Sequence, residues 1–261
     1  MIGQYANIRI TVYPGTAKNG WQENFYPIDI NPGDTISIVG HTGSGKTAFI
    51  NDIEVFAQGD TVTKREIRVN GETPPESFVR DPACKPIAMI TQNTKCLADL
   101  TVREFLNMHA EIRENSAEDI SEKTLELANE FTGEKIKADF KMSSLSGGQT
   151  RSIMIADAVM ISDTPIILLD EIENAGIFKD AVISRLRYLG RAVIFVTHDP
   201  FVSMLSDRRI VMKGGEVVSV LIPGEAEKEA LATVREIDET LAGVRERIKA
   251  GEVIEGGSIW T

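Results

Sequence analysis

Residues 40–47 read GHTGSGKT and have the composition and spacing of a phosphate-binding loop. The apolar run 35–39 precedes this segment, and a helical pattern over 48–57 follows it. In that setting, backbone N–H groups freed by glycine surround phosphates at the positive end of a helix. Lys46 would reach the β and γ phosphates, and Thr47 would ligate Mg²⁺. The segment therefore predicts a nucleoside triphosphate site.

Two carboxylates, Asp170 and Glu171, end the apolar run 166–169. Ligands of α/β proteins bind at the carboxyl ends of parallel strands. At such an end, Asp170 can orient Mg²⁺ or its water, and Glu171 can accept a proton from an attacking water. An acidic pair after an apolar strand is common by itself, but this pair shares a chain with a phosphate-binding loop. The combination indicates hydrolysis of the bound nucleotide.

Residues 145–149, LSGGQ, form a second candidate anion site. Ser146, Gly147 and Gly148 precede a helical run, 153–160. They would expose N–H groups and a hydroxyl at a helix N-terminus. One chain would then carry two phosphate-binding surfaces.

The elements that must position these residues follow an α/β pattern. Near-continuous apolar runs separated by helical patterns predict a mostly parallel sheet covered on both faces. These runs are 35–39, 87–90, 166–169 and 192–197. Helical patterns, among them 102–112 and 121–131, replace strand patterns between 101 and 159 and predict an inserted helical lobe.

Shorter runs flank this core. Those at 8–13, 25–30 and 66–70 end in Pro or Gly turns and predict an N-terminal antiparallel β layer at the edge. The runs 209–212 and 216–221, joined by Lys213-Gly214-Gly215, predict a hairpin.

The C-terminal tail has a helical stripe of apolar residues. After Pro223, these residues recur at steps of four and three: Ala230, Val234, Ile237, Leu241, Val244 and Ile248. The favoured expectation is that the stripe packs on its own domain, with packing on a symmetry mate as the alternative.

Composition excludes several classes of protein. The 261 residues carry 39 acidic and 28 basic side chains, a formal net charge of −11, which disfavours binding to nucleic acid. The longest uncharged stretch with apolar character, 35–45, is too short to span a bilayer, and residues 1–10 do not resemble a signal peptide. The spacing of Cys84 and Cys96 fits free thiols. We therefore expect a cytoplasmic location, with a peripheral position on the inner face of the cell membrane as the alternative.

The motifs occur in the order typical of the ATP-binding cassette (ABC) ATPases, which the chain resembles from residue 8 to about 223. The family's motifs correspond to these segments: Walker A to 40–47, the Q-loop to Gln92, the signature to 145–149, Walker B to 166–171, the D-loop to Asn174 to Ile177, and the switch histidine to His198. Residues 100–104, LTVRE, look like the opening of the family's helical lobe. The resemblance implies a P-loop NTPase core at residues 1–222, with the lobe at about 93–160, and a helical tail at 223–261.

The resemblance also implies a mechanism, with ATP and Mg²⁺ as ligands. Two copies, or one copy and another ABC subunit, would associate head to tail. Each ATP would lie between Lys46 of one protomer and Ser146 and Gly148 of the other. The family pattern assigns nucleotide contacts to Gly40, Thr42, Gly43, Ser44, Gly45, Lys46, Thr47, Ser146, Gly147, Gly148 and Gln149.

Further roles follow from the same resemblance. Glu171 would polarise the attacking water, and His198 would contact the γ phosphate. Gln92 would join Thr47 and Asp170 around Mg²⁺ and sense the partner. An aromatic side chain would stack on adenine, with Tyr13 favoured and Trp21 as the alternative.

Several positions depart from the family pattern. Ile172 and Ile177 stand where the family usually has a proline after the catalytic glutamate and an aspartate ending the D-loop. Ser152 and Asp157 replace two common arginines. These changes question how the two protomers communicate.

Two functions of different classes fit the sequence. In the first, the chain is the ATPase subunit of a membrane transporter, and a separate spanning subunit docks beside Gln92 and the helical lobe. In the second, it is a soluble ABC ATPase that remodels or activates a cytoplasmic protein complex. A role in DNA repair is disfavoured because the cohesin-like family members insert a long coiled coil between Q-loop and signature, where this chain has a short segment.

Overall fold

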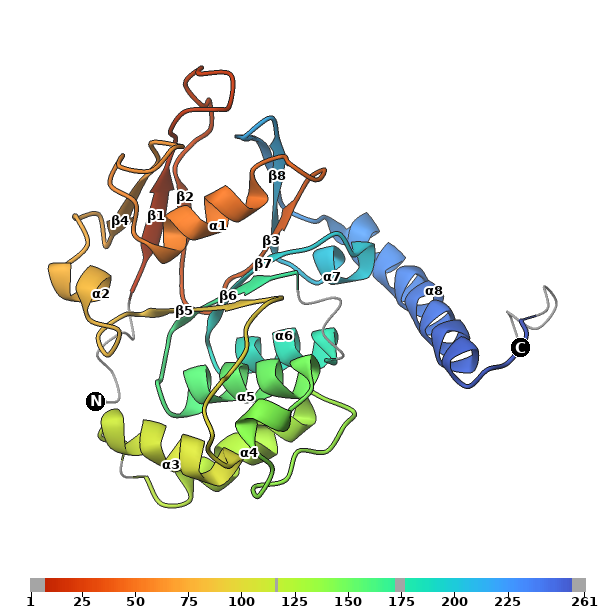
Figure 1. Cartoon of the computed structure of the whole chain (residues 1–261). Helices are drawn as coiled ribbons and strands as arrows, with labels where there is room; N and C mark the ends of the chain where they lie inside the picture. Colours follow the sequence, from red (N-terminus) through yellow and green to blue (C-terminus); the bar gives the residue numbers. More distant parts are fainter. Residues whose placement is uncertain (1–7, 116, 172–176, 255–261) are drawn as a thin grey trace.

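The computed structural model describes residues 8–115, 117–171 and 177–254 (Figure 1). Its central sheet has six strands in the order β5-β6-β7-β3-β8-β9. The strands are β3 (Thr35–Val39), β5 (Ile87–Thr91), β6 (Ile166–Asp170), β7 (Ala192–Val196), β8 (Arg208–Lys213) and β9 (Glu216–Leu221). β9 runs antiparallel to β8, and the other neighbouring strands are parallel. The predicted mostly parallel sheet and its terminal hairpin are confirmed.

A second, antiparallel sheet joins β2 (Ile28–Ile30), β1 (Ile10–Tyr13) and β4 (Glu66–Val69). The predicted antiparallel layer is confirmed, but it is a separate sheet and not an extension of the main sheet's edge. β4 reaches this sheet because helix α1 (Lys46–Glu54) carries the chain across the face of the main sheet.

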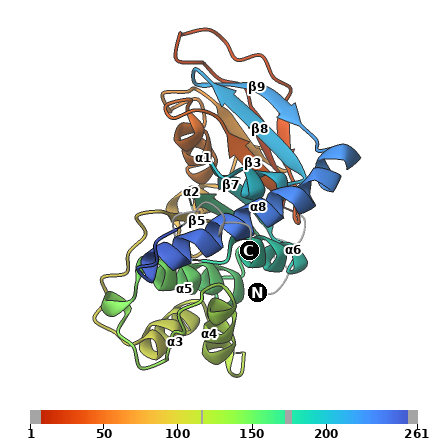
Figure 2. The same cartoon turned by 90° about the vertical axis from the view of Figure 1, so that its right-hand side faces the viewer.

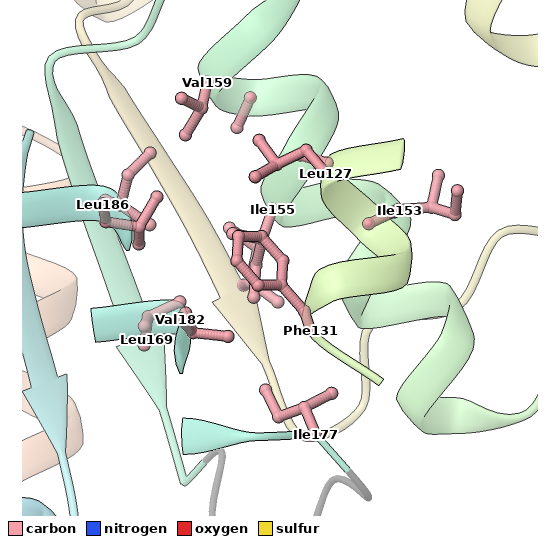
Figure 3. Close-up of a cluster of buried hydrophobic side chains, with 14 of the residues drawn as sticks. Leu127, Phe131, Ile153, Ile155, Val159, Leu169, Ile177, Val182 and Leu186 are labelled. Carbon is pink, nitrogen blue, oxygen red and sulfur yellow. The ribbon is translucent and has the colours of Figure 1, made fainter. Parts of the chain in front are cut away.

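Two apolar cores lie on opposite faces of the main sheet, because side chains alternate along each strand. Ile166 and Leu168 of β6 pack with α1 and the small sheet, whereas Ile167 and Leu169 pack with the helices on the other face. Those helices are α3 (Val102–Ile112), α4 (Ile120–Glu130), α5 (Gly147–Met160) and α6 (Lys179–Tyr188). Figure 3 shows Phe131 at the centre of this second core.

The predicted helical insertion consists of α3, α4 and α5, together with a 3₁₀ turn, Met142–Ser144; it connects β5 to β6. Sequence patterns did not indicate α2 (Glu76–Arg80), α6 or α7 (Pro200–Met204). α2 and α7 have only five residues each, which is too few to show a helical period.

The predicted tail helix is α8 (Glu225–Lys249), and it projects from the body of the molecule (Figure 1). It packs mainly against α7, and none of its residues is buried. The expectation that its apolar stripe packs on its own domain is therefore wrong for most of its length. α7 is simply too short to cover a helix of 25 residues.

No helix in the described part of the chain is long and apolar enough to cross a membrane.

Candidate functional site

Four neighbouring parallel strands deliver the predicted motifs to one edge of the main sheet. Thr91, Asp170 and Val196 lie opposite one another on β5, β6 and β7, and Ile38 of β3 pairs with Val196. The residues that follow these strands, among them Gln92, Glu171, His198 and Gly40, therefore leave the sheet along the same edge. This register brings together motifs that lie far apart in the sequence.

The phosphate-binding loop has a conformation that requires its glycines. Gly40, Gly43 and Gly45 have φ angles of 152°, 77° and 103°. A Cβ atom on Gly40 would lie 2.3 Å from the carbonyl oxygen of Met212. Lys46 is only 6% exposed, and its ammonium donates to the carbonyls of Gly40 at 2.8 Å and His41 at 3.3 Å. The loop thus curls around the Lys46 ammonium.

The remaining loop residues are arranged around the start of α1. Ser44 is buried, and Thr42 and Thr47 are exposed. Because Thr47 is in the first turn of α1, its hydroxyl is available to a ligand at the positive end of that helix. The side chain of His41 is exposed.

The turn between β8 and β9 supports this loop from behind. The N–H of Gly215 donates to the carbonyl of Ser44 at 2.9 Å, and a Cβ atom on Gly45 would lie 2.9 Å from the Cα of Gly215. Lys18, from the loop after β1, donates its ammonium to the carbonyl of Gly43 at 2.6 Å. Two segments remote in sequence thus fix the shape of the phosphate loop.

A buried ionic cluster holds these supports in place. Arg65 is fully buried and pairs with Glu23 at 2.7 Å and with Asp52 of α1 at 3.0 Å. It also donates to the carbonyl of Gly215 at 2.8 Å. Sequence reasoning missed this cluster, because charges dispersed through the sequence give no sign that they meet.

Glu171 and His198 face each other at the sheet edge. His198 Nε2 lies 3.8 Å from Glu171 Oε1, and both side chains are about two-fifths exposed. Glu171 has a φ of 51°, an uncommon backbone conformation for a residue other than glycine, and its N–H donates to the carbonyl of Val196 at 3.1 Å. His198 and Gly40 both line a hollow of about 260 Å³. The structure therefore places the predicted base and the switch histidine beside the phosphate loop.

The signature segment starts helix α5 with a capping box. The N–H of Gln149 donates to the Ser146 hydroxyl at 3.3 Å, and the N–H of Ser146 donates to Gln149 Oε1 at 2.9 Å. Ser146 and Gly147 are exposed, whereas Gln149 is buried. The Gln149 side chain thus builds the cap, and the exposed groups at the helix start belong to Ser146 and Gly147.

Arg151 of α5 links the signature helix to the Q-loop, a contact that sequence reasoning missed. Its guanidinium donates to the backbone carbonyl of Gln92, and its side chain is buried. Burial lowers the pKa of the Arg151 guanidinium. A Cβ atom on Gly147 would lie 3.0 Å from Arg151 Nη2, so a larger residue there would crowd the guanidinium. The sequence does carry a signal for this contact. Arg151 lies one position before Ser152, and Ser152 is the position at which the family often has an arginine.

Residues 174–176 of the predicted D-loop, beginning with Asn174, and the neighbouring Ile172 lie outside the described residues. Ile177 is described, and it is buried in the second core beside Phe131 (Figure 3). An aspartate at this position would be buried among apolar side chains, so the departure from the family pattern suits the local packing.

The two aromatic candidates for stacking on adenine precede and follow Lys18 in the sequence. Tyr13 ends β1 and is 37% exposed, whereas Trp21 is 74% exposed in the loop that follows. Both are accessible, so a ring in either position could stack on a base.

The donor set suits a nucleotide with a magnesium ion. Within the described residues, no three His, Cys, Asp or Glu side chains form a metal cluster. Mg²⁺ does not need one, because it is usually held by one or two protein oxygens together with substrate phosphates. The hydroxyl of Thr47, the carboxylate of Asp170 and the amide of Gln92 are oxygen donors of that kind.

Comparison with known proteins agrees with this geometry. The family model described as "ABC transporter" matches residues 26–174. The chain is 47% identical over 243 residues to "Uncharacterized ABC transporter ATP-binding protein MJ0121" of Methanocaldococcus jannaschii, covering 93% of each chain. It is 34% identical to the sn-glycerol-3-phosphate import ATP-binding protein UgpC of a Ruegeria species, covering 72% of this chain and 54% of that protein.

Solved structures show the same fold at lower identity. The cassette MJ0796, solved as a dimer bound to ADP and Pi, has a TM-score of 0.59 and 24% identity over 82% of this chain and 99% of its own. CbiO1 of Clostridium perfringens, part of the transporter complex CbiONQ, has a TM-score of 0.63 and 20% identity over 92% of this chain and 98% of its own. The chain therefore belongs to the ABC transporter family, as one of its ATP-binding and ATP-hydrolysing cassettes.

Proposed function

We propose that this ABC ATPase energises a membrane transporter through ATP-driven head-to-tail dimerisation. The observation that carries the proposal is the separation of two anion-binding surfaces within one chain. The loop that holds Lys46 follows strand β3 of the main sheet, whereas the exposed Ser146 and Gly147 start α5, in the helical layer below that sheet (Figure 1). A single ATP can touch both surfaces only if they come from two protomers.

Each half of such a composite site would have a distinct task. The glycine-rich loop and Lys46 would hold the phosphates of one ATP, and the N-terminus of α5 from the other protomer would cover its γ phosphate. The MJ0796 cassette, which was solved as a dimer, supports this arrangement for a chain of the same fold.

Hydrolysis would use the pair at the sheet edge. Glu171 would accept a proton from the attacking water, and His198 would orient the γ phosphate beside it. Thr47, Asp170 and Gln92 would hold Mg²⁺, which neutralises charge that develops on the phosphates. Tyr13 would stack on the adenine, with Trp21 as the other candidate.

The helical lobe offers a surface for a partner subunit. A hollow of about 970 Å³ lies between α3 and α4, and its walls include Leu106, Ile120, Leu125 and Ile136. A spanning subunit that docked at the lobe would move α5 and, through the bond between Arg151 and Gln92, the Q-loop with it. Docking of this kind would hold the cassette peripherally, on the cytoplasmic side of its membrane partner.

Fractionation of the native host tests this function. We expect the protein to sediment with membranes and to be recovered, after mild detergent extraction, with a membrane-spanning subunit. Recovery only in the high-speed supernatant, bound to a complex without a spanning subunit, would contradict the transporter function. That outcome would favour the soluble ABC ATPase that remodels or activates a protein complex.

A further inference from the structure

Helix α8 carries an apolar stripe that the rest of its own chain does not cover. Ile237 and Leu241 are each 47% exposed, and Ile248 is 58% exposed. These residues belong to a series with alternating steps of four and three: Ala230, Val234, Ile237, Leu241, Val244 and Ile248. That spacing matches the a and d positions of a heptad repeat, which form a seam along one side of a helix.

Among the described residues, the ion pairs that anchor α8 to the body lie in the first half of the helix. Glu227 pairs with Arg209, and Arg235 pairs with Asp180 at 3.5 Å and lies 5.2 Å from the centre of the Phe201 ring. In the described chain, the ion pairs after Arg235 are local to the helix end: Glu246 with Lys249, and Arg247 with Glu252. The second half of the stripe therefore extends beyond the body.

Helix α8 projects from the side of the molecule where the main strands end and α1 begins (Figure 1). The carboxyl ends of the main strands and the start of α1 lie on the right-hand side of Figure 1, and α8 projects from that side. In Figure 2, where this side faces the viewer, α8 crosses in front of the molecule. A second cassette that covers the nucleotide site would approach this same face, and it would bring its own α8 with it.

We propose that α8 pairs antiparallel with α8 of a second copy of this chain and tethers the two cassettes between ATP turnovers. The proposal rests on the head-to-tail dimer proposed above. A two-fold axis that lies in the interface between the cassettes, across the direction of α8, reverses that direction in the second copy, so the two helices run antiparallel. The seams of both helices then face each other across the axis.

Charges on the flanks of the stripe agree with this pairing. If Leu241 packs on Val244 of the second copy and Ile237 on its Ile248, Asp238 comes to lie beside Arg245 of that copy, and the contact occurs twice. Neither Asp238 nor Arg245 has an ion-pair partner among the residues that the structure describes.

The composition of α8 distinguishes this partner from a lipid surface. The helix has seven acidic and five basic residues, so its net charge is 5 − 7 = −2. Helices that lie on anionic membranes are rich in Lys and Arg on their polar face. A second α8, which offers the matching seam and the complementary charges, fits the stripe better.

Cross-linking tests the direction and the register of the pair. In a full-length background with Cys84→Ser and Cys96→Ser, the double variant Ile237→Cys/Ile248→Cys should form a covalent dimer under mild oxidation or with a short bismaleimide. The single variants Ile237→Cys and Ile248→Cys are matched controls that should stay uncoupled. A self-linked single variant would indicate a parallel pair and overturn the proposal, and so would a double variant that does not link.

Sedimentation without nucleotide tests the seam in the full chain. At about 100 µM protein, the wild type should contain dimers, and Leu241→Asp should raise the dissociation constant at least about tenfold. Ala242→Asp adds the same charge at the neighbouring exposed position, off the stripe, and should leave the dimer unchanged. A wild type that is monomeric without nucleotide, or a dimer that Leu241→Asp does not weaken, overturns the proposal.

A measurement with ATP separates this proposal from the function on which it rests. In the Glu171→Gln background, Leu241→Asp should still dimerise when ATP is saturating, since the nucleotide interface remains. If Glu171→Gln/Leu241→Asp fails to dimerise with ATP while Glu171→Gln alone still forms the nucleotide-free α8 dimer, the composite ATP site is wrong and the α8 pair stands.

Discussion

His198 Nε2 lies 3.8 Å from Glu171 Oε1, although 27 positions separate the two residues in the sequence. The proximity follows from the register of β6 and β7, which pairs Asp170 with Val196 and lets both side chains emerge at the same level of the sheet. Both remain partly exposed, so a γ phosphate and a water can approach them.

Glu171→Gln should bind MgATP but hydrolyse it at least about a hundredfold more slowly, because loss of a general base typically costs 10² to 10⁴ in rate. The variant should accumulate as an ATP-bound dimer, measured by light scattering together with single-turnover hydrolysis. Lys46→Ala, which removes the phosphate-binding ammonium, is the control that should neither bind ATP nor gain dimer when ATP is added. A Glu171→Gln variant that keeps wild-type turnover would exclude Glu171 as the base.

Ser146→Arg should leave the affinity of the monomer for ATP nearly unchanged and lower ATPase activity at least about tenfold. The reason is steric, since the new side chain occupies the surface that must cover the nucleotide of the other protomer. Ser146→Asn retains an N-capping side chain and controls for damage to the start of α5. Equilibrium dialysis with labelled ATP would contradict the composite site if Ser146→Arg abolished binding by the monomer.

Arg151→Met should reduce kcat roughly tenfold while changing KM for ATP by less than about twofold, because its guanidinium contacts the Gln92 carbonyl and not the nucleotide loop. Amide hydrogen exchange at residues 91–95 should accelerate in the variant. Arg151→Lys, which retains a donor, should recover part of the rate. If exchange in the Q-loop is unchanged, and the fall in kcat is accompanied by a fall in the free energy of unfolding, the role of Arg151 is merely structural.

The capping box of α3 should make stability depend on pH. Glu104 accepts hydrogen bonds from the N–H of Thr101 at 2.7 Å and from its hydroxyl at 2.8 Å, and these bonds hold the pKa of Glu104 below its ordinary value. Since the folded pKa is the lower one, the stabilisation is present above the pKa of the unfolded chain and is lost as pH falls through the folded pKa.

Urea unfolding of Glu104→Ala at two pH values measures this effect. The variant should be less stable than the wild type at pH 7, and the difference should shrink toward pH 3. Asn107→Ala, an exposed change on the same helix, should give a difference that does not vary with pH. A constant difference for Glu104→Ala would show that its carboxylate does not act through its charge.

Local spacing was sufficient to find most of the elements and the motifs. β3, β9 and α3 begin and end as their patterns predict, because a strand or helix of an α/β protein shows its period within a few residues. The phosphate loop was recognisable for the same reason: its glycines, lysine and threonine are consecutive, so the geometry that they require is local.

Only the tertiary structure decided which remote residues meet. The order β5-β6-β7-β3 arises from hydrogen bonds between strands that are far apart in the chain, and it alone brings Gln92, Glu171, His198 and Gly40 to one edge. The contact of Arg151 with Gln92 and the buried cluster around Arg65 depend on that packing in the same way. The stripe on α8 was visible as a period, but its exposure was not, because a period places apolar residues on one face and cannot show what covers that face.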